Sequence, residues 1–590
     1  MRAMRNSGRV ALGTLAGAAI AALIAPLIRP LFSAPHGGVG FVTVAAYPKS
    51  WDYAVVALLI ASAFAGGAIA AMFAPRSTSE ELVRRPSVQV SWITAIVVFM
   101  LMIFMHDMPY ALIEPFHEGE HLTAGWLMKS GARPYGDFYI FHGLATDAAL
   151  DALVLGDPPS PLHVRRQQTI LDALTLALLV PIAFELTATT IGAIAGVITS
   201  LCAMAALWLP LFPFYRLAPV MLALIALLRY RRNGSALALF IAFASSTLGV
   251  LWSLDTGMYA LTSVAICFVV LRIARLEEKP LPLMSVVLLA IVAFMLPIII
   301  LVAVRADIRQ FFIDSFVVMP RAIDAVWSLP APAKLFSGEA VRYYLPPIFY
   351  GYLFALALLA WRRGDRWAAS RLIVVAVFSV LLFRTASGRV SWAHTRFSMP
   401  LLGIAVVAFV IEPLLHNRQR LAALVVIVPL LFYFEIAQNF SAGAKLLAAW
   451  RGRQRHEGLV RYPFATGKGI YALPQNAKDL EALNGLIFAL DRNHGTILDL
   501  SNERAIYYLL QRRAPIRCME ISMLSVPRML DEAMAQLNAH PPVCVILEGY
   551  AEVAKYDGLS NRDRVPALAA WIDAHYPNRR HAGRFLVALP

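Results

Sequence analysis

Long apolar runs alternate with short polar segments over the first three quarters of the chain. A membrane-spanning helix needs about 20 mostly apolar residues to cross about 30 Å of hydrocarbon, and about thirteen segments meet this criterion. They lie near residues 10–28, 53–74, 88–105, 168–187, 191–210, 214–229, 235–253, 258–273, 281–303, 345–361, 370–384, 398–415 and 420–437. The pattern therefore predicts an α-helical polytopic membrane protein.

The pattern changes after about residue 438, where short apolar stretches alternate with amphipathic ones. Segments 496–500, 543–547 and 584–588 are typical of strands, and segments 503–511, 527–539 and 567–574 are typical of helices. This alternation predicts a small α/β domain. We expect three regions: two N-terminal spans in 1–80, a membrane core in 81–438 with outer loops 106–167 and 304–344, and the α/β domain in 439–590.

Composition narrows the class further. The 590 residues are 59% hydrophobic and only 15% charged, whereas a soluble domain has about a quarter charged residues. This excludes a soluble globular or a disordered protein, and 4 Cys exclude a disulfide-rich scaffold. Cys518 and Cys544 both fall in the expected outer domain, where a disulfide between them is an open alternative.

The net charge of +15 is concentrated between the apolar runs, at 84–85, 229–232 and 272–279 among others. Short cytoplasmic loops of membrane proteins carry such Lys and Arg excess, so the charge does not indicate nucleic-acid binding. The alternation predicts a cytoplasmic N-terminus, with both long loops and the α/β domain outside. We expect a bacterial inner membrane, a periplasmic domain and a retained first span rather than a cleaved signal peptide.

Ionisable side chains gather in the first outer loop. They are Glu114, His117, Glu118, Glu120, His121, Asp137, His142 and Asp147. Such groups are costly to bury at a membrane face, so they mark a candidate functional site; the alternative is a solvated loop whose acids face water. His and carboxylate groups can also ligate a divalent cation, although this spacing selects no particular metal.

A second cluster lies between two late spans and contains Arg384, Arg389, His394 and Arg396. Three Arg on the outer side run against the usual charge distribution of membrane proteins. Guanidinium groups suit phosphate or pyrophosphate, so the cluster is a candidate anion site. The alternative is a charged hairpin that contacts lipid headgroups, with Trp392 as an interfacial anchor.

The first loop resembles that of GT-C-type integral-membrane glycosyltransferases, the class that includes protein O-mannosyltransferases and the lipid A aminoarabinose transferase. Many bacterial members have Asp-Glu-Gly, a Leu three residues on, and then Gly-x-x-Pro-Tyr-x-Asp-Phe. The matching positions are His117-Glu118-Gly119, Leu122 and 131–138. The stretch 388–394 resembles a second recurring pattern, Gly-Arg-x-x-x-x-His, and the tail resembles the family's outer α/β domain.

The resemblance implies a polyprenyl-phosphate-linked sugar donor whose tail lies between spans, and an extracytoplasmic glycan, lipid or protein acceptor. It implies inversion at the anomeric carbon, with Glu118 or Glu120 as general base. Arg389 and His394 would contact the donor phosphate. The other candidate substrate-binding residues are His117, His121, Asp137, His142, Asp147, Arg384 and Arg396, of which Asp137 and His142 would orient the acceptor or a divalent cation.

The sequence departs from the family at its first acid, because His117 stands there. Either Glu118 or Glu120 has taken over the role, or this protein performs different chemistry. Two residues apart on a helix, the two acids would point about 200° from each other. We therefore expect only one to face a cleft, and we favour Glu118 because it matches the second acid of the family pair.

Two other functions fit parts of the pattern. A secondary transporter would also place charges near broken helices, but it would usually lack a long structured outer loop and a large outer domain. A non-catalytic protein that binds a lipid-linked sugar would explain His117.

The aromatic residues of segment 304–344 predict short amphipathic helices that cover the cavity at the interface. The alternative is a flexible linker.

Overall fold

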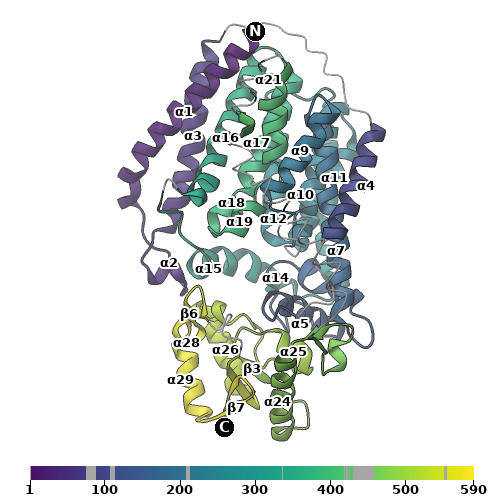
Figure 1. Cartoon of the computed structure of the whole chain (residues 1–590), viewed down its shortest axis with the longest axis vertical. Helices are drawn as coiled ribbons and strands as arrows, with labels where there is room; N and C mark the ends of the chain where they lie inside the picture. Colours follow the sequence, from purple (N-terminus) through teal and green to yellow (C-terminus); the bar gives the residue numbers. More distant parts are fainter. Residues whose placement is uncertain are drawn as a thin grey trace.

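The structure, a computed structural model, describes residues 2–74, 88–105, 113–207, 213–334, 337–416, 458–549 and 555–590, with the short pieces 419, 423, 426–428 and 441. A tall bundle of helices contains the N-terminus at its far end, and a smaller domain with the C-terminus lies at the opposite end (Figure 1). The two parts follow each other in sequence, as the change of pattern near residue 438 predicts.

Seven of the described helical segments are long and apolar enough to cross a membrane. They are α1 (Arg2–Ile28), α3 (Lys49–Met72), α7 with α8 (Pro161–Ala177 and Leu179–Leu186), α12 (Leu254–Ile273), α13 (Leu283–Ala303), α16 (Gly338–Arg362) and α17 with α18 (Arg366–Leu382 and Arg384–Gly388). The α-helical polytopic class is therefore confirmed.

Five further apolar helical segments complete the described part of the bundle. They are α4 (Val88–Met105), α9 (Thr190–Ala203), α10 (Ala218–Asn233), α11 (Ala236–Trp252) and α20 with η5 and α21 (Leu402–Val406, Val407–Ile411 and Glu412–His416). They coincide with predicted spans but are shorter than about 20 residues, so length alone does not establish that each crosses the membrane. The thirteenth predicted span, 420–437, lies largely outside the described residues.

A row of short helices separates the bundle from the C-terminal domain (Figure 1). It comprises α14 (Ile308–Ile313), η4 (Asp314–Val318) and α15 (Met319–Val326). In α15, Met319, Ala322 and Val326 are buried while Arg321 is exposed. Segment 304–344 thus contains short amphipathic helices, as expected, rather than a linker without structure.

The C-terminal domain is built on a four-stranded sheet in the order β3-β4-β8-β7. β3 (Ile497–Asp499) and β4 (Cys544–Glu548) are parallel, and β8 (Phe585–Leu589) runs antiparallel to both β4 and β7 (Asn578–Ala582). Its helices are α24 (Pro474–Leu490), α25 (Ala505–Leu510), α26 (Pro527–Ala539), α28 (Asn561–Arg564) and α29 (Pro566–His575). The α/β prediction holds, and Cys518 and Cys544 are both buried and free, so they form no disulfide.

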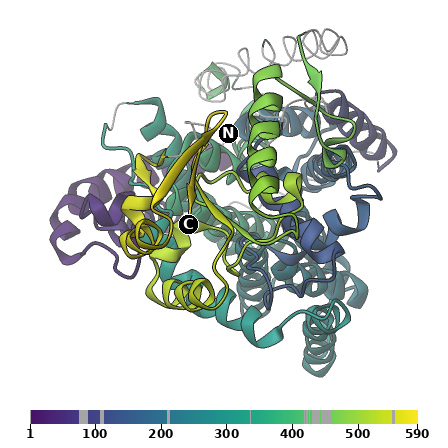
Figure 2. The same cartoon turned by 90° about the horizontal axis from the view of Figure 1, so that it is seen from below.

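The first outer loop docks directly onto this domain through α5 (His117–Lys129), which packs against α25. Figure 2 shows the domain from below, lying across the ends of the bundle helices. The amide of Ala505 donates to Pro115 O at 3.0 Å. A Cβ on Gly119 would lie 2.2 Å from the Ala505 nitrogen, so this contact requires glycine in the His-Glu-Gly stretch.

Candidate functional site

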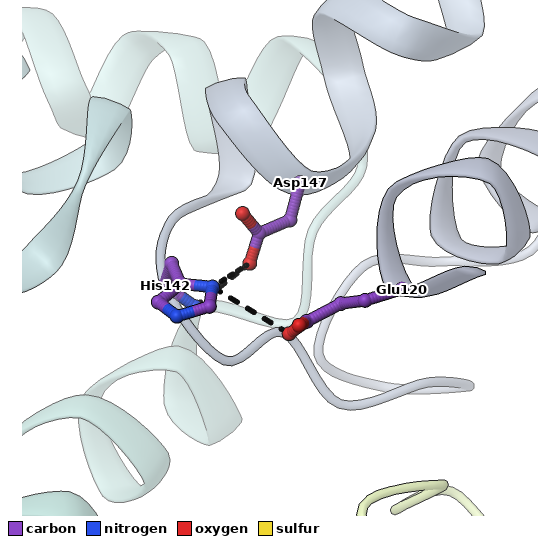
Figure 3. A group of neighbouring side chains, drawn as sticks. All are labelled: Glu120, His142 and Asp147. Carbon is purple, nitrogen blue, oxygen red and sulfur yellow. Dashed lines mark hydrogen bonds and ion pairs between the residues drawn. The ribbon is translucent and has the colours of Figure 1, made fainter. Parts of the chain in front are cut away.

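Three ionisable side chains of the first outer loop converge at one point (Figure 3). His142 Nδ1 lies 3.6 Å from Glu120 Oε1 and 3.4 Å from Asp147 Oδ2. Glu120 and Asp147 are buried, and His142 is partly exposed. This group of three is called the acid–histidine cluster below.

Local backbone structure brings the three residues together. Glu120 lies in the first turn of α5, and Asp147 lies in the π-helical turn η2 (Ala145–Ala149). The loop that carries His142 is tied to that turn, because the His142 amide donates to Asp147 Oδ2 at 2.7 Å. Thr146 Oγ1 donates to Trp252 O at 2.7 Å and fixes the turn to the end of α11.

A second imidazole, that of His121, lies next to the acid–histidine cluster. His121 Nδ1 lies 3.4 Å from Asp151 Oδ2 and 4.0 Å from Asp147 Oδ1. Burial alone would lower the pKa of His121, but the hydrogen bond to Asp151 and the neighbouring carboxylates raise it to about 9. Burial likewise would raise the pKa of Asp147, yet the nearby His142 and His121 hold it well below its usual range. At neutral pH the acid–histidine cluster therefore contains an ionised Asp147, and the neighbouring His121 is protonated.

The two acids of α5 point to different partners, as their spacing predicts. Glu118 forms a two-point ion pair with Arg165 of α7, at 2.5 and 2.8 Å, whereas Glu120 reaches the acid–histidine cluster. Only one of the two acids therefore joins the cluster. It is Glu120, and the preference for Glu118, which rested on the family pattern, does not fit this geometry.

The C-terminal domain contributes an Arg and an acid to the same site. Arg504 Nη1 lies 3.3 Å from Glu120 Oε2, and its Nη2 forms an ion pair with Glu520. Glu120, Asp147, Arg504 and Glu520 line a cavity of about 20 Å³ between α5 and the domain. Arg504 and Glu520 were not among the predicted site residues, because nothing in a single sequence signals which residues of a separate domain face the first loop.

A much larger apolar cavity lies between α3, α12, α16 and α17, with a volume of about 1150 Å³. Along α12 its lining extends from Tyr259 to Ile273, which corresponds to about 21 Å of helix. Its polar lining groups are Tyr53, Tyr259, Arg384 and Ser387. Tyr53 donates to Asp324 of α15, so this polar end faces the C-terminal domain.

Each residue of the second predicted cluster has a different close partner. The Arg384 guanidinium lies 4.0 Å above the Tyr53 ring and 3.4 Å from Asp324, at the polar end of the apolar cavity. Arg389 forms a two-point ion pair with Asp557, at 2.7 and 3.0 Å. His394 is half-buried and its Nδ1 lies 2.7 Å from Ser391 Oγ, whereas Arg396 is buried and lies over the Trp392 ring.

Electrostatic interactions connect the acid–histidine cluster with the polar end of the cavity. Asp255 interacts electrostatically with His142 and lies 2.8 Å from Arg216. Tyr259, one turn further along α12, interacts with both Asp255 and Arg384. The polar end of the apolar cavity therefore neighbours the acid–histidine cluster.

Two predicted residues lie outside this arrangement. The His117 side chain is 66% exposed and lies 3.4 Å from Glu114. Asp137 is 43% exposed and pairs with Arg133 at 3.2 Å, closing the turn 133–137. Neither contacts the acid–histidine cluster.

The acid–histidine cluster has the composition and spacing of a divalent-cation site. One ligand atom from each of Glu120, His142 and Asp147 can be chosen so that all lie within 4.8 Å of one another. Glu120 Oε1 is buried and has no hydrogen-bond partner among the described residues. One His and two carboxylates fit a divalent cation with further positions open to other ligands.

The similarity of this chain to known proteins is limited. No family model matches the chain, and no curated protein matches it. Crystal structures of ArnT from Cupriavidus metallidurans, one bound to undecaprenyl phosphate and one in the apo state, are each 14% identical to it with a TM-score of 0.46. They cover 85% of this chain and 97% and 98% of their own. Values this low leave the chemistry to be argued from the residues themselves.

Proposed function

We propose that this protein is a membrane glycosyltransferase that moves a sugar from a polyprenyl-phosphate carrier to an acceptor on the side of the C-terminal domain. The observation that carries the proposal is the apolar cavity, about 1150 Å³, whose polar end neighbours a buried carboxylate–histidine cluster. The motif resemblance of the first loop supports the same class. In this proposal that side is the periplasm of a bacterium, and the acceptor is a glycan, lipid or protein.

The cavity suits the donor's lipid tail. Its lining runs for about 21 Å along α12 and its polar groups are gathered at one end, so a polyprenyl chain would remain in apolar surroundings with its phosphate at Arg384. Arg384 has the donors to bind that phosphate, and more than a third of its side chain is exposed. Among the four basic residues of the second cluster, only Arg384 lines the cavity, and it takes the phosphate role first expected of Arg389.

The reaction needs a base for the acceptor hydroxyl. Glu120 is the base in this proposal: its Oε1 takes the proton as the acceptor oxygen bonds to the anomeric carbon. The bond from that carbon to the phosphate oxygen breaks, and polyprenyl phosphate leaves with the electron pair. Attack opposite the leaving group inverts the anomeric centre, and Arg384 stabilises the charge that develops on the phosphate.

A divalent cation, when bound, would act as a Lewis acid beside the reacting groups. Glu120, His142 and Asp147 would hold it, and Glu120 could act as the base only while its Oε1 is not a ligand of the cation. Without it, the same three residues still orient the acceptor through carboxylate and imidazole hydrogen bonds.

The proposal is tested by reconstituting the protein in lipid nanodiscs with defined polyprenyl-phosphate sugars and a panel of glycan, lipid and protein acceptors. Mass spectrometry should detect released polyprenyl phosphate, and native mass spectrometry should detect the bound lipid. Ala61→Trp, which fills the cavity wall, should abolish lipid binding; Val287→Trp, on an exposed position of α13 outside the cavity lining, should not. A protein that binds the donor but never releases polyprenyl phosphate would instead be a non-catalytic binder.

A further inference from the structure

We infer that Arg504 of the C-terminal domain is a positioning residue that aims Glu120, so that the catalytic site is complete only when this domain is docked. The inference rests on the proposed function. Arg504 lies in the loop between β3 and α25, in a different domain from the residue it holds. Its side chain is 6% exposed, so its contacts are made within the protein rather than with solvent.

Three groups fix the Arg504 guanidinium. Glu520 forms an ion pair with Nη2, the Phe116 ring lies 4.4 Å below the guanidinium carbon, and Glu120 Oε2 lies 3.3 Å from Nη1. Glu520 is itself held, because Ser522 Oγ donates to its Oε1 at 2.6 Å. A planar guanidinium held on one side by a fixed acid offers its remaining donors in a defined direction.

The backbone around Arg504 is equally constrained. Its carbonyl accepts from Thr123 Oγ1 at 2.8 Å, and the next amide donates to Pro115 O at 3.0 Å. The close approach of Gly119 to Ala505 leaves no room for a side chain between α5 and α25. The relative position of Arg504 and Glu120 is therefore set by backbone contacts on both sides of the pair.

The two carboxylate oxygens of Glu120 therefore have different contacts. Oε2 is held by Arg504, while Oε1 is buried, faces His142 and has no hydrogen-bond partner in the described part of the chain. Oε1 is thus the oxygen left to accept a proton. Errors of about 1 Å in such an orientation can lower a rate about 10²-fold.

A purely structural role must be distinguished from this one, and Arg517 provides the matched comparison. It is also a buried Arg of the C-terminal domain, and it reaches η4 through Asp314 at 2.5 Å while pairing within its own domain with Glu532 of α26 at 2.6 Å. Its described contacts do not include the acid–histidine cluster. Both Arg504 and Arg517 therefore connect the C-terminal domain to the rest of the protein, but of these two only Arg504 contacts Glu120.

The experiment measures kcat, donor KM and melting temperature of full-length Arg504→Met and Arg517→Met in nanodiscs. We expect Arg504→Met to lose about 10²-fold in kcat with donor KM unchanged, while folded Arg517→Met keeps wild-type kcat even where its melting temperature falls. Arg504→Lys should recover part of the rate, since it retains the charge without the fixed planar donors. If Arg504→Met fails to fold, the double variant Arg504→Met/Glu520→Gln removes both charges together and should show the same kcat loss.

The outcomes separate the inference from the proposed function. Equal kcat for folded Arg504→Met, or its double variant, and Arg517→Met overturns the positioning role while leaving the transferase intact. A wild-type protein that binds polyprenyl-phosphate sugars without transfer overturns the transferase, and the positioning role with it.

Discussion

The two polar clusters near the outer ends of the helices are built in opposite ways. Glu120, His142 and Asp147 come from three separate turns of one loop, yet their ligand atoms lie within 4.8 Å of one another. Arg384 and Arg389 are only five residues apart, yet one lines the apolar cavity and the other pairs with the C-terminal domain. Residues of the loop therefore lie close together, whereas Arg384 and Arg389 contact different parts of the molecule.

The physical reason lies in the backbone between the residues. The first loop folds back on itself, and its side chains are tied to its own amides, such as that of His142. In segment 384–397, α18 ends at Gly388 and Arg389 adopts an extended conformation (φ −124°, ψ 98°), after which α19 (Trp392–Phe397) begins. Each element turns its side chains in a new direction.

The largest expected effect concerns Glu120. Glu120→Gln keeps the shape but removes the proton acceptor, and we expect transfer activity to fall about 10²–10⁴-fold. Glu118→Gln, which weakens the ion pair with Arg165, should cost much less. Initial rates of polyprenyl phosphate release measure both. A larger loss for Glu118→Gln than for Glu120→Gln would restore the family's second acid as the base.

The sequence anticipated the fold better than the site. Apolar length and period identified the apolar helices and three of the four strands of the main sheet, because burial and lipid contact act on local pattern. It missed β7, whose residues 578–581 are all exposed and polar, and α24. Spacing on a helix predicted that the two acids of α5 diverge, but their separate partners, Arg165 and Arg504, come from distant segments that periodicity cannot reveal.

The next effect concerns the cavity end of the second cluster. Arg384→Ala should weaken donor binding about 10–100-fold, because one charge-assisted hydrogen bond contributes about 1.5–3 kcal/mol. Arg384→Lys should retain part of that affinity. Native mass spectrometry with polyprenyl phosphate measures the binding, and Arg366→Ala, on an exposed position at the start of α17, serves as control. Unchanged affinity in Arg384→Ala would remove Arg384 from the donor site.

A smaller effect should appear in the pH dependence of stability. The pKa of His121 is raised to about 9 in the folded protein against about 6.5 when unfolded. The folded state therefore binds more protons between these values, so its stability is fully present below about pH 6.5 and is lost as pH rises through about 9. The loss amounts to about 3 kcal/mol at most.

Thermal unfolding in nanodiscs from pH 6.5 to 9.5 measures this loss. His121→Gln should lower the melting temperature at pH 6.5 and flatten its decline above that pH. A decline of equal slope in both proteins would assign the pH dependence to other groups.

The smallest effect is expected at the contact between Arg389 and the C-terminal domain. Asp557 pairs with Arg389 at 2.7 Å, and the Arg389 side chain also donates to Trp327 O. Because neither residue lines the apolar cavity, Asp557→Asn should lower the melting temperature modestly while donor affinity stays at the wild-type value. The same nanodisc binding and unfolding measurements test it. An increase in donor affinity in Asp557→Asn would mean that the carboxylate competes with the donor phosphate for Arg389, and both clusters would then contact the donor.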